Sequence, residues 1–245
     1  MNIIVCTNSN ILQVSLAHKM IPQGINLIKL NTLEEVAASI PVHSDIALID
    51  DTNLDQKQMV KMIVDIKKDE NKKSAKLLLI TKSSDIELIK VFTKLGATFV
   101  LQSSLHPDTI TDKFFSFLQQ FASQHKERRF VRIKLESKEE NLIKLLLPNK
   151  TYTNGIMSDI SMGGLAGKFP QNDISLMMET HVYPNCQISI DGKNILADLR
   201  LVKKGGDILA FSFEKMRDTF KDHLAEIIYR RIQKNLIQEQ QVISQ

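Results

Sequence analysis

The sequence predicts two domains: an α/β domain with a doubly wound, parallel five-stranded sheet, and a small antiparallel β-barrel that ends in an α-helix. The chain has 245 residues, a length that suits two domains better than one. In the first half, short apolar runs alternate with amphipathic stretches, which is typical of parallel strands covered by helices. In the second half, short alternating runs are separated by turn signals, which is typical of a small barrel.

The α/β domain is predicted from five apolar runs and from the helix signals between them. The runs are NIIVCT, INLIKL, DIALID, KLLLIT and ATFVLQ. Thr32 with Glu35, and Ser84 with Glu87, have the spacing of a capping box and predict two helix starts. Gly96 stands where the second of these helices is expected to end. Strands and helices therefore alternate along the first half.

The barrel is predicted from the runs VRIKLE, NLIKLLL, TNGIMSDI, CQISI, NILADLRLVKK and ILAFSFE, with the turn signals PNK, DGK and GGD between them. An amphipathic helix is expected to follow from Glu214 to Gln241, with an apolar face that begins at Met216. Such a helix is longer than one small barrel needs as a cover. Its far end is open to three readings: contact with the first domain or a partner, a homodimer, or a frayed polar tail.

The charges are distributed unequally between the two halves. In the first 122 residues, 13 lysines balance 13 acidic residues and there is no arginine. All seven arginines and the net charge of +4 therefore belong to the second half. Arginine presents a planar fork that matches phosphate and a guanine edge, whereas lysine is a point charge. The second half is the better candidate for anion recognition, although a net charge of +4 is too small to indicate a nucleic-acid binder.

Several classes of protein find no support in the sequence. Cys6 and Cys186 lie far apart in different halves, which argues against a disulfide and for a reducing, cytoplasmic location. No signal peptide is visible, and no apolar stretch approaches the roughly 18 residues of a membrane span. The sequence also shows no metal-ligand spacing, no nucleophile paired with a base and no helix-turn-helix motif. We therefore expect no enzyme, no cofactor and no DNA binding.

The first half resembles the receiver domain of bacterial response regulators over roughly residues 1–122. In that family, an aspartate at the end of the third strand accepts a phosphoryl group, and a Thr or Ser ends the fourth strand. The segment DIALIDD places Asp50 at the first of these positions, and LLLIT places Thr81 at the second. The resemblance implies a five-stranded parallel sheet, with Asp50 near the edge of the sheet where the family accepts the phosphoryl group.

Other positions of the receiver pattern are changed. The acidic pair that binds Mg²⁺ in the family is replaced by Thr7 and Asn8, and the lysine after the fifth strand is replaced by Ser103, followed by Ser104. A hard cation needs carboxylate oxygens, and phosphoryl transfer needs positive charge at the transferred group. We therefore expect a degenerate receiver, a pseudo-receiver, in which Asp50 is a vestigial phosphoacceptor or simply a strand-end carboxylate.

The second half carries two spaced motifs. The segment HKERRFVRI contains Arg128 and Arg132 in an RxxxR pattern, and DISMGG contains Asp159, Ser161 and Gly164 in a DxSxxG pattern. In this order, with strands between and after them, the two motifs resemble the signatures of the PilZ domain. The resemblance runs from about Lys126 to the terminal helix. It implies cyclic di-GMP as the ligand, often bound as a stacked dimer, and a PilZ-type barrel.

The chemistry of these residue types suits a cyclic dinucleotide. Arginine forks match phosphate and the O6 and N7 acceptors of guanine. A carboxylate can accept the guanine N–H groups, a serine hydroxyl can donate to phosphate, and glycines permit close approach or a positive φ. The expected ligand-binding residues are Arg128, Arg129, Arg132, Asp159, Ser161, Gly163 and Gly164.

Two features of the PilZ-like half stand apart from the motif residues. The fuller family motif begins with paired arginines, and here Glu127 takes the first place, Arg128 the second, with Arg129 as an extra arginine in the spacer. Arg200 is either a further ligand contact or an exposed strand residue. Together the resemblances place a receiver-like domain at residues 1–122, a linker that carries the arginine arm at 123–132, and the barrel with its helix at 133–245.

Three functions are compatible with these motifs. The first is a non-enzymatic cyclic di-GMP receptor that relays the signal to a protein partner, such as motility or signalling machinery. The second is a response regulator that is phosphorylated at Asp50 and uses the barrel as output. The third is a PilZ adaptor that binds no nucleotide, which Glu127 would favour. The intact RxxxR and DxSxxG patterns, set against the lost acidic pair and lysine, favour the first.

Overall fold

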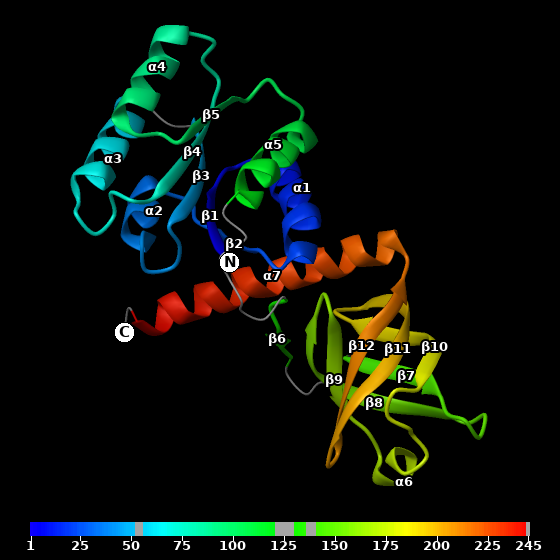
Figure 1. Ribbon diagram of the computed structural model, residues 1–245. Helices are drawn as coiled ribbons and strands as arrows, with labels where there is room; N and C mark the ends of the chain where they lie inside the picture. Colours follow the sequence, from blue (N-terminus) through cyan, green and yellow to red (C-terminus); the bar gives the residue numbers. More distant parts are fainter. Residues whose placement is uncertain (52–55, 121–129, 136–140, 244–245) are drawn as a thin grey trace. The chain divides into compact units, whose positions relative to one another are not determined.

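The structure is a computed structural model that describes residues 1–51, 56–120, 130–135 and 141–243, with backbone only for 235–243 (Figure 1). The chain divides into two compact units. The first unit comprises Met1–Glu127 with Ile232–Gln245, and the second comprises Arg128–Arg231. Each unit is described by itself.

The first unit contains a five-stranded parallel sheet. Its strands are β1 (Asn2–Cys6), β2 (Asn26–Lys29), β3 (Ile46–Asp50), β4 (Lys76–Thr81) and β5 (Phe99–Gln102), in the order β2-β1-β3-β4-β5. Ile4, Leu48 and Leu78 in the central strands are fully buried, as expected for a sheet covered on both faces. The predicted doubly wound α/β fold is confirmed.

Helices cover both faces of this sheet. They are α1 (Asn10–Met20), the 3₁₀ helix η1 (Ile21–Gln23), α2 (Leu33–Ser39), α3 (Gln56–Lys68), α4 (Ile86–Leu95) and α5 (Pro107–Gln119). α1 and α5 lie together on one face, and α2, α3 and α4 lie on the other (Figure 1). On the second face, Val36, Met59, Ile63 and Phe92 pack against the sheet in one apolar cluster. Because helices cover both faces, the sheet remains accessible at the ends of its strands.

The helix signals of the first half are confirmed except at one position. The Thr32 hydroxyl accepts a hydrogen bond from the backbone N–H of Glu35 (3.1 Å), and both halves of the capping box form. Gly96 ends α4 with φ of +110°. The assignment of Ser84 as the cap of α4 is wrong, because the carboxylate of Asp85 accepts from Glu87 N–H instead (2.9 Å). Asp85, which follows the expected serine, is also a favoured N-cap residue, and with it as the cap helix α4 starts one residue later.

The second unit is an antiparallel barrel. Its strands and short helix are β6 (Ile133–Lys134), β7 (Leu142–Leu146), β8 (Tyr152–Ser161), β9 (Gly164–Lys168), α6 (Gln171–Ile174), β10 (Val182–Ile190), β11 (Lys193–Gly205) and β12 (Ile208–Met216). The ring runs β8-β7-β10-β11-β12-β9 and closes where β9 pairs with β8. β6 pairs with Asp159 and Ile160 near the end of β8, beyond the stretch of β8 that pairs with β7. The predicted barrel is therefore confirmed, and its turns carry left-handed residues at Lys150, Asp191, Gly192 and Gly206.

The terminal helix α7 (Asp218–Ile243) begins later than expected. Glu214 and Met216 are wrong as helix residues, because β12 continues to Met216, which pairs with Ala197 of β11. Within the second unit, Leu224, Ile227 and Ile228 of the predicted apolar face are buried, whereas Phe220 is half-buried. The homodimer through this helix stays a hypothesis.

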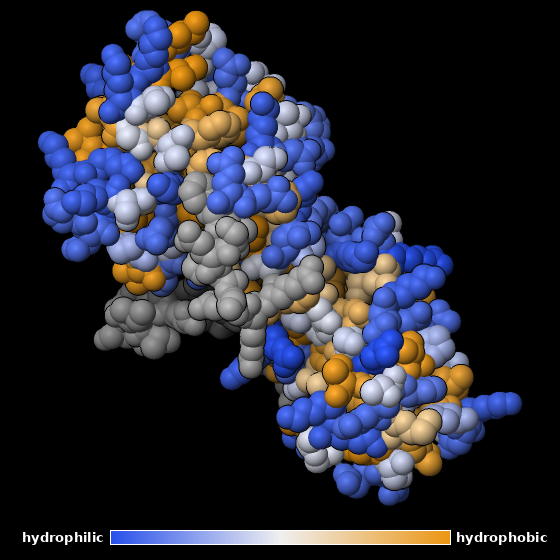
Figure 2. Space-filling model, viewed as in Figure 1, coloured by the Kyte–Doolittle hydropathy of each residue, from blue (hydrophilic) through white to orange (hydrophobic). Residues whose placement is uncertain are grey.

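The surface of each unit is mixed in polarity. On the face shown in Figure 2, hydrophilic residues predominate and apolar ones are scattered between them. Ile11, Val42 and Ile86 of the first unit are large apolar residues that are exposed. Among the described residues, no helix combines the length and apolar character that crossing a membrane requires.

Candidate functional site

The pairing of β6 with β8 brings the end of the arginine arm to the DxSxxG segment. Arg132 directly precedes β6, in which Lys134 is paired with Asp159 of β8. As a result, Arg132 Nη1 lies 3.7 Å from Asp159 Oδ1. Arg132 is more than half exposed, whereas Asp159 is largely covered. Of the other residues expected here, Arg128 and Arg129 lie outside the described residues.

One carboxylate oxygen of Asp159 has no hydrogen-bond donor in the described part of the chain. This Oδ1 atom is buried, and none of the described residues donates a hydrogen bond to it. The 3.7 Å separation from Arg132 is longer than a hydrogen bond, although it allows an ionic attraction. A buried acceptor without a donor raises the free energy of the folded state. A ligand N–H group placed here would remove that penalty.

The Ser161 hydroxyl forms hydrogen bonds within the protein. Ser161 is buried, its hydroxyl donates to the carbonyl oxygen of Gly164 (3.1 Å), and it accepts from the N–H of Gly163 (3.3 Å). These bonds close the turn between β8 and β9. The sequence suggested a hydroxyl that donates to phosphate, whereas in this structure the same hydroxyl fixes the turn that follows Asp159.

The two motif glycines are required by packing. Neither has a positive φ, so the suggestion of a left-handed conformation is wrong for both. A Cβ atom on Gly164 would lie 2.1 Å from the carbonyl oxygen of Phe211, and a Cβ atom on Gly163 would lie 2.5 Å from the ring of Phe130. Close approach is therefore the reason for both glycines, and the approaching groups belong to the protein itself.

Phe130 joins the two motifs. It lies between Arg128 and Arg132 in the sequence, and its ring packs on Gly163 of the other motif. The sequence analysis did not single out this residue. An aromatic residue inside the arginine arm was the available signal, but its partner is more than thirty positions away and only the fold shows the contact. Phe130 thus lies beside the turn after β8.

Small residues cover the barrel face next to Asp159. Strand pairing aligns Asp159 with Ala166, Ala166 with Ala210, and Gly164 with Ser212. Residues that are paired across strands point to the same face of the sheet. This row of residues therefore shares one face of the sheet, here called the floor, with Asp159 at one side; Ala166 within it is buried.

Arg200 stands on the far side of this floor. It is paired with Ser212 on the neighbouring strand β12. Its Nη2 donates to Glu214 Oε2 (3.0 Å), and its Nε donates to the other oxygen of the same carboxylate. This fork raises the pKa of Arg200 and lowers the pKa of Glu214. Arg200 is thus an ion-paired residue at the border of the floor.

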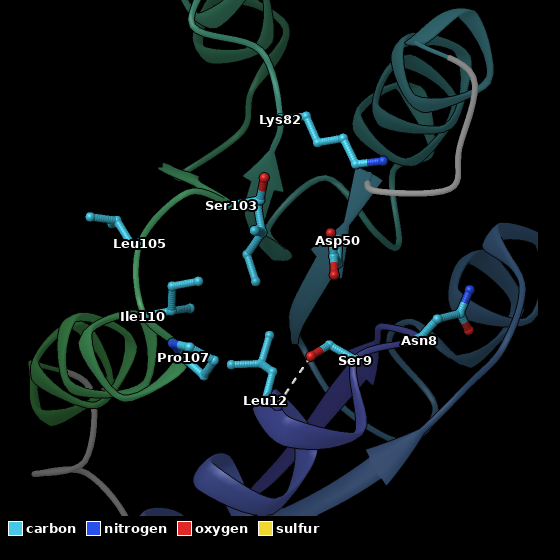
Figure 3. A pocket seen from close by; sticks show the side chains of 10 residues that line it. Asn8, Ser9, Leu12, Asp50, Lys82, Ser103, Leu105, Pro107 and Ile110 are labelled. Atoms are coloured by element: carbon cyan, nitrogen blue, oxygen red, sulfur yellow. Dashed lines mark hydrogen bonds between the residues drawn. The ribbon is translucent and has the colours of Figure 1, made fainter.

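A second candidate site surrounds Asp50 in the first unit. The Thr7 hydroxyl donates to Asp50 Oδ2 (2.7 Å), so the residue that replaces a metal-binding acid instead holds the carboxylate. A cavity of about 460 Å³ opens beside Asp50 and is also lined by Asn8, Ser9 and Ser103 (Figure 3). Thr81, at the end of β4, is buried, and its hydroxyl accepts from Ser83 N–H (3.1 Å).

Lys82 corrects one expectation about this cavity. The sequence placed no positive group near Asp50, because Ser103 replaces the lysine that follows the fifth strand in receivers. In the structure, Lys82 lines the same cavity from the end of β4. Within the part of the chain that the structure describes, no cluster of three or more His, Cys, Asp and Glu residues is suited to hold a metal ion. Asp50 thus has a cation in the same cavity, while Thr7 and Asn8 stand where receivers carry their acidic pair.

Comparisons with known proteins find similarity to two kinds of solved domain. The PilZ domain of YcgR from Escherichia coli, solved with c-di-GMP, is 16% identical with a TM-score of 0.37, covering 49% of this chain and 98% of that one. The PilZ domain of CeSA from a cellulose-synthesizing bacterium is 16% identical with a TM-score of 0.31, covering 40% and 97%. A response regulator from Thermotoga maritima is 18% identical with a TM-score of 0.40, covering 48% and 97%. No family model and no curated protein matches the chain.

The two thiols of the chain are poor nucleophiles. Cys6 and Cys186 are both buried and free. Burial raises the pKa of Cys6 to about 11 and that of Cys186 to about 12. Since the thiolate is the reactive form, both side chains act as small apolar groups in their cores at neutral pH.

Proposed function

We propose that the chain is a cyclic di-GMP receptor that binds the dinucleotide on the barrel face beside Arg132 and Asp159. The observation that carries the proposal is the arrangement of these two residues, with a buried Asp159 oxygen that no described residue satisfies. Guanine presents N1–H and N2–H₂ donors that complement this oxygen. An arginine fork complements phosphate and the guanine O6 and N7 atoms. The resemblance of the two motifs to PilZ signatures supplies the identity of the ligand.

The shape of the surrounding face supports a flat, anionic ligand. Small residues form the floor, with Arg132 and Asp159 at one side and Arg200 at the other. Two guanidinium groups at opposite sides of a floor of small residues suit a molecule with flat bases and two phosphates. In this proposal Arg200 exchanges Glu214 for a phosphate or a base. Arg128 and Arg129 are proposed as further ligand contacts because they belong to the RxxxR segment.

The proposed receptor relays a signal and catalyses no reaction. Ligand that engages Arg132 and Asp159 also acts on Phe130, which is packed on Gly163 between the same two motifs. The position of the arm would thereby report occupancy of the site. A protein partner is expected to read this change, and the receiver-like unit is the proposed surface for it.

Calorimetric titration of the full chain with cyclic di-GMP tests the proposal. Arg132→Ala removes a charged, bidentate contact of about 1–3 kcal/mol, so affinity should fall about tenfold to a hundredfold. Arg132→Lys should also weaken binding, because an ammonium group cannot form the fork. Arg230→Ala is the matched control, since Arg230 is exposed on α7 and pairs only loosely with Glu226. Equal titration of wild type and Arg132→Ala would contradict the proposal, and no binding at micromolar ligand would favour the adaptor.

Phosphorylation at Asp50 is the second candidate, and the presence of Lys82 in the cavity favours it. The replacement of the receiver's acidic pair by Thr7 and Asn8 opposes it, because Mg²⁺ binding needs carboxylate oxygens and phosphoryl transfer needs the metal. We expect no phosphoryl adduct after incubation with acetyl phosphate and Mg²⁺, as measured by intact mass. An adduct that disappears in Asp50→Asn would promote the response-regulator function instead.

A further inference from the structure

The cavity beside Asp50 lies at the edge of the sheet where α/β proteins bind ligands. Asn8 and Ser9 follow β1, and Asp50 ends β3, so the cavity opens between two neighbouring strands whose connections run to opposite sides. In open α/β sheets, ligands bind outside the carboxyl ends of the strands at such a point. Its volume of about 460 Å³ falls within the usual range for small-molecule sites, about 300–1,000 Å³.

The lining of the cavity is divided into an apolar and a polar side. Leu12, Leu105, Pro107 and Ile110 gather on one side, contributed by α1, by α5 and by the segment before it (Figure 3). Asp50 and Lys82 stand on the other side, with one negative and one positive charge. A ligand that fills this space must combine an apolar body with a polar end.

The polar side is held in place by the protein itself. Thr7 donates to Asp50 Oδ2 (2.7 Å), and the carbonyl oxygen of Thr7 accepts from the side-chain amide of Gln13 (2.7 Å). Gln13 is buried. The Ser9 hydroxyl caps α1 by accepting from Leu12 N–H (3.2 Å). Groups that are already fixed lose little entropy when a ligand binds.

We infer that this cavity binds an apolar α-amino acid. The ligand ammonium would pair with Asp50, its carboxylate with Lys82, and its side chain would pack on Leu12, Pro107 and Ile110. A carboxylate offers about four acceptor positions and an ammonium three donors, so Asp50 and Lys82 can keep their present partners and still bind the ligand. A zwitterion fits a site with one charge of each sign. A metal ion would be attracted by Asp50 but repelled by Lys82, and a phosphate would be attracted by Lys82 but repelled by Asp50. The inference is independent of the cyclic di-GMP site.

Ligand-observed NMR and thermal-shift titrations of the full chain test the inference. L-leucine and L-phenylalanine should bind saturably. The analogues 3-phenylpropionate, which lacks the ammonium, 2-phenylethylamine, which lacks the carboxylate, and L-alanine, which lacks the apolar body, should each bind at least about tenfold more weakly. Asp50→Asn should weaken binding, and Ser103→Trp should abolish it by filling the cavity. Asp112→Asn, at an exposed carboxylate of α5, should leave binding unchanged.

Three outcomes would overturn the inference. The first is no saturable binding of either amino acid up to about 10 mM, a concentration that detects even weak sites. The second is unchanged binding in both Asp50→Asn and Ser103→Trp, which would place the ligand elsewhere. The third is equal binding of an analogue that lacks one charge. Cyclic di-GMP titration of Ser103→Trp should match wild type, so failure of this inference and failure of the receptor function can be told apart.

Discussion

Asp50 and Asp159 each stand at or near the end of a strand, one in each unit, and their carboxylates have different surroundings. Asp50 Oδ2 accepts a 2.7 Å hydrogen bond from Thr7, whose own oxygen accepts from Ser9 N–H. Asp159 Oδ1 is buried, has no hydrogen bond among the described residues, and lies 3.7 Å from Arg132. The first carboxylate belongs to a network that is complete without ligand, whereas the second does not.

This difference leads to different expectations for ligand binding. A buried acceptor without a donor destabilises a fold by about 1–3 kcal/mol, and a ligand donor at Asp159 would relieve that penalty as it binds. A ligand at Asp50 can only add to contacts that already exist. We therefore expect tight binding at Asp159 and weak binding at Asp50.

The largest effect is expected from Gly164→Val, which separates the packing role of the DxSxxG motif from its ligand role. Because a Cβ atom at this position would lie 2.1 Å from the Phe211 carbonyl oxygen, the β9–β12 pairing must shift. We expect a loss of about 3 kcal/mol or more in the free energy of unfolding, measured with urea. Gly205→Ala is the control, since its Cβ would meet nothing closer than 3.6 Å. Equal stability of the two variants would refute the packing argument.

The next effect tests the comparison directly by making the same change at both aspartates. Asp50→Asn weakens the acceptor for Thr7 and should lower the free energy of unfolding by about 1 kcal/mol. Asp159→Asn removes a charge that is poorly satisfied, so stability should change little, while cyclic di-GMP affinity should fall about tenfold. Urea unfolding gives the stability of both variants, and calorimetry gives their affinity for cyclic di-GMP. A greater loss of stability at Asp159 than at Asp50 would reverse the comparison.

Local signals in the sequence were sufficient for most of the fold. The capping box at Thr32 and the helix end at Gly96 depend on neighbouring residues, and both are confirmed. The spacing of Ser84 and Glu87 predicts a capping box, but Asp85 can also cap, and only the backbone of the turn decides between them. The start of α7 was placed too early because β12 continues through Met216, whose partner is Ala197 on another strand.

Long-range contacts explain what the sequence could not show about the sites. Lys82 was overlooked because the receiver pattern expects its lysine after the fifth strand, and a cation from the fourth strand reaches the same cavity only in the fold. Phe130 was overlooked because its contact with Gly163 depends on the closed barrel. Ser161 has the expected position, but its bonds to the turn are visible only once β8 and β9 are paired.

A smaller effect is expected from Gly163→Ala, which asks whether the position of the arm contributes to the Asp159 site. The added methyl group would meet the Phe130 ring at 2.5 Å, so the ring must move while every charged group stays in the chain. We expect cyclic di-GMP affinity to fall about threefold to tenfold, or roughly 0.6–1.4 kcal/mol, with little change in unfolding. Phe130→Ala should give a loss of similar size, and wild-type affinity in both variants would remove Phe130 from the site.

The Arg200–Glu214 pair provides a finer adjustment of the same site. The hydrogen-bonded guanidinium holds the pKa of Glu214 below its ordinary value. A lowered folded-state pKa means that the pair contributes its stability above the ordinary glutamate pKa, about 4.3, and loses it as pH falls through the lowered value. At neutral pH the pair is therefore complete, and Glu214 competes with any ligand anion for Arg200.

The smallest effect is expected from Glu214→Gln, which removes this competition. A neutral amide binds a guanidinium less strongly than a carboxylate does, so Arg200 would be released to the ligand at lower cost. Because the pair is solvent-exposed and contributes little, we expect cyclic di-GMP affinity to rise only about twofold to threefold, measured by calorimetry at neutral pH. In an Arg200→Ala background, the same substitution should have no effect. A gain that persists without Arg200 would mean that Glu214 acts on the ligand directly, by repulsion, and that Arg200 is only its surface partner.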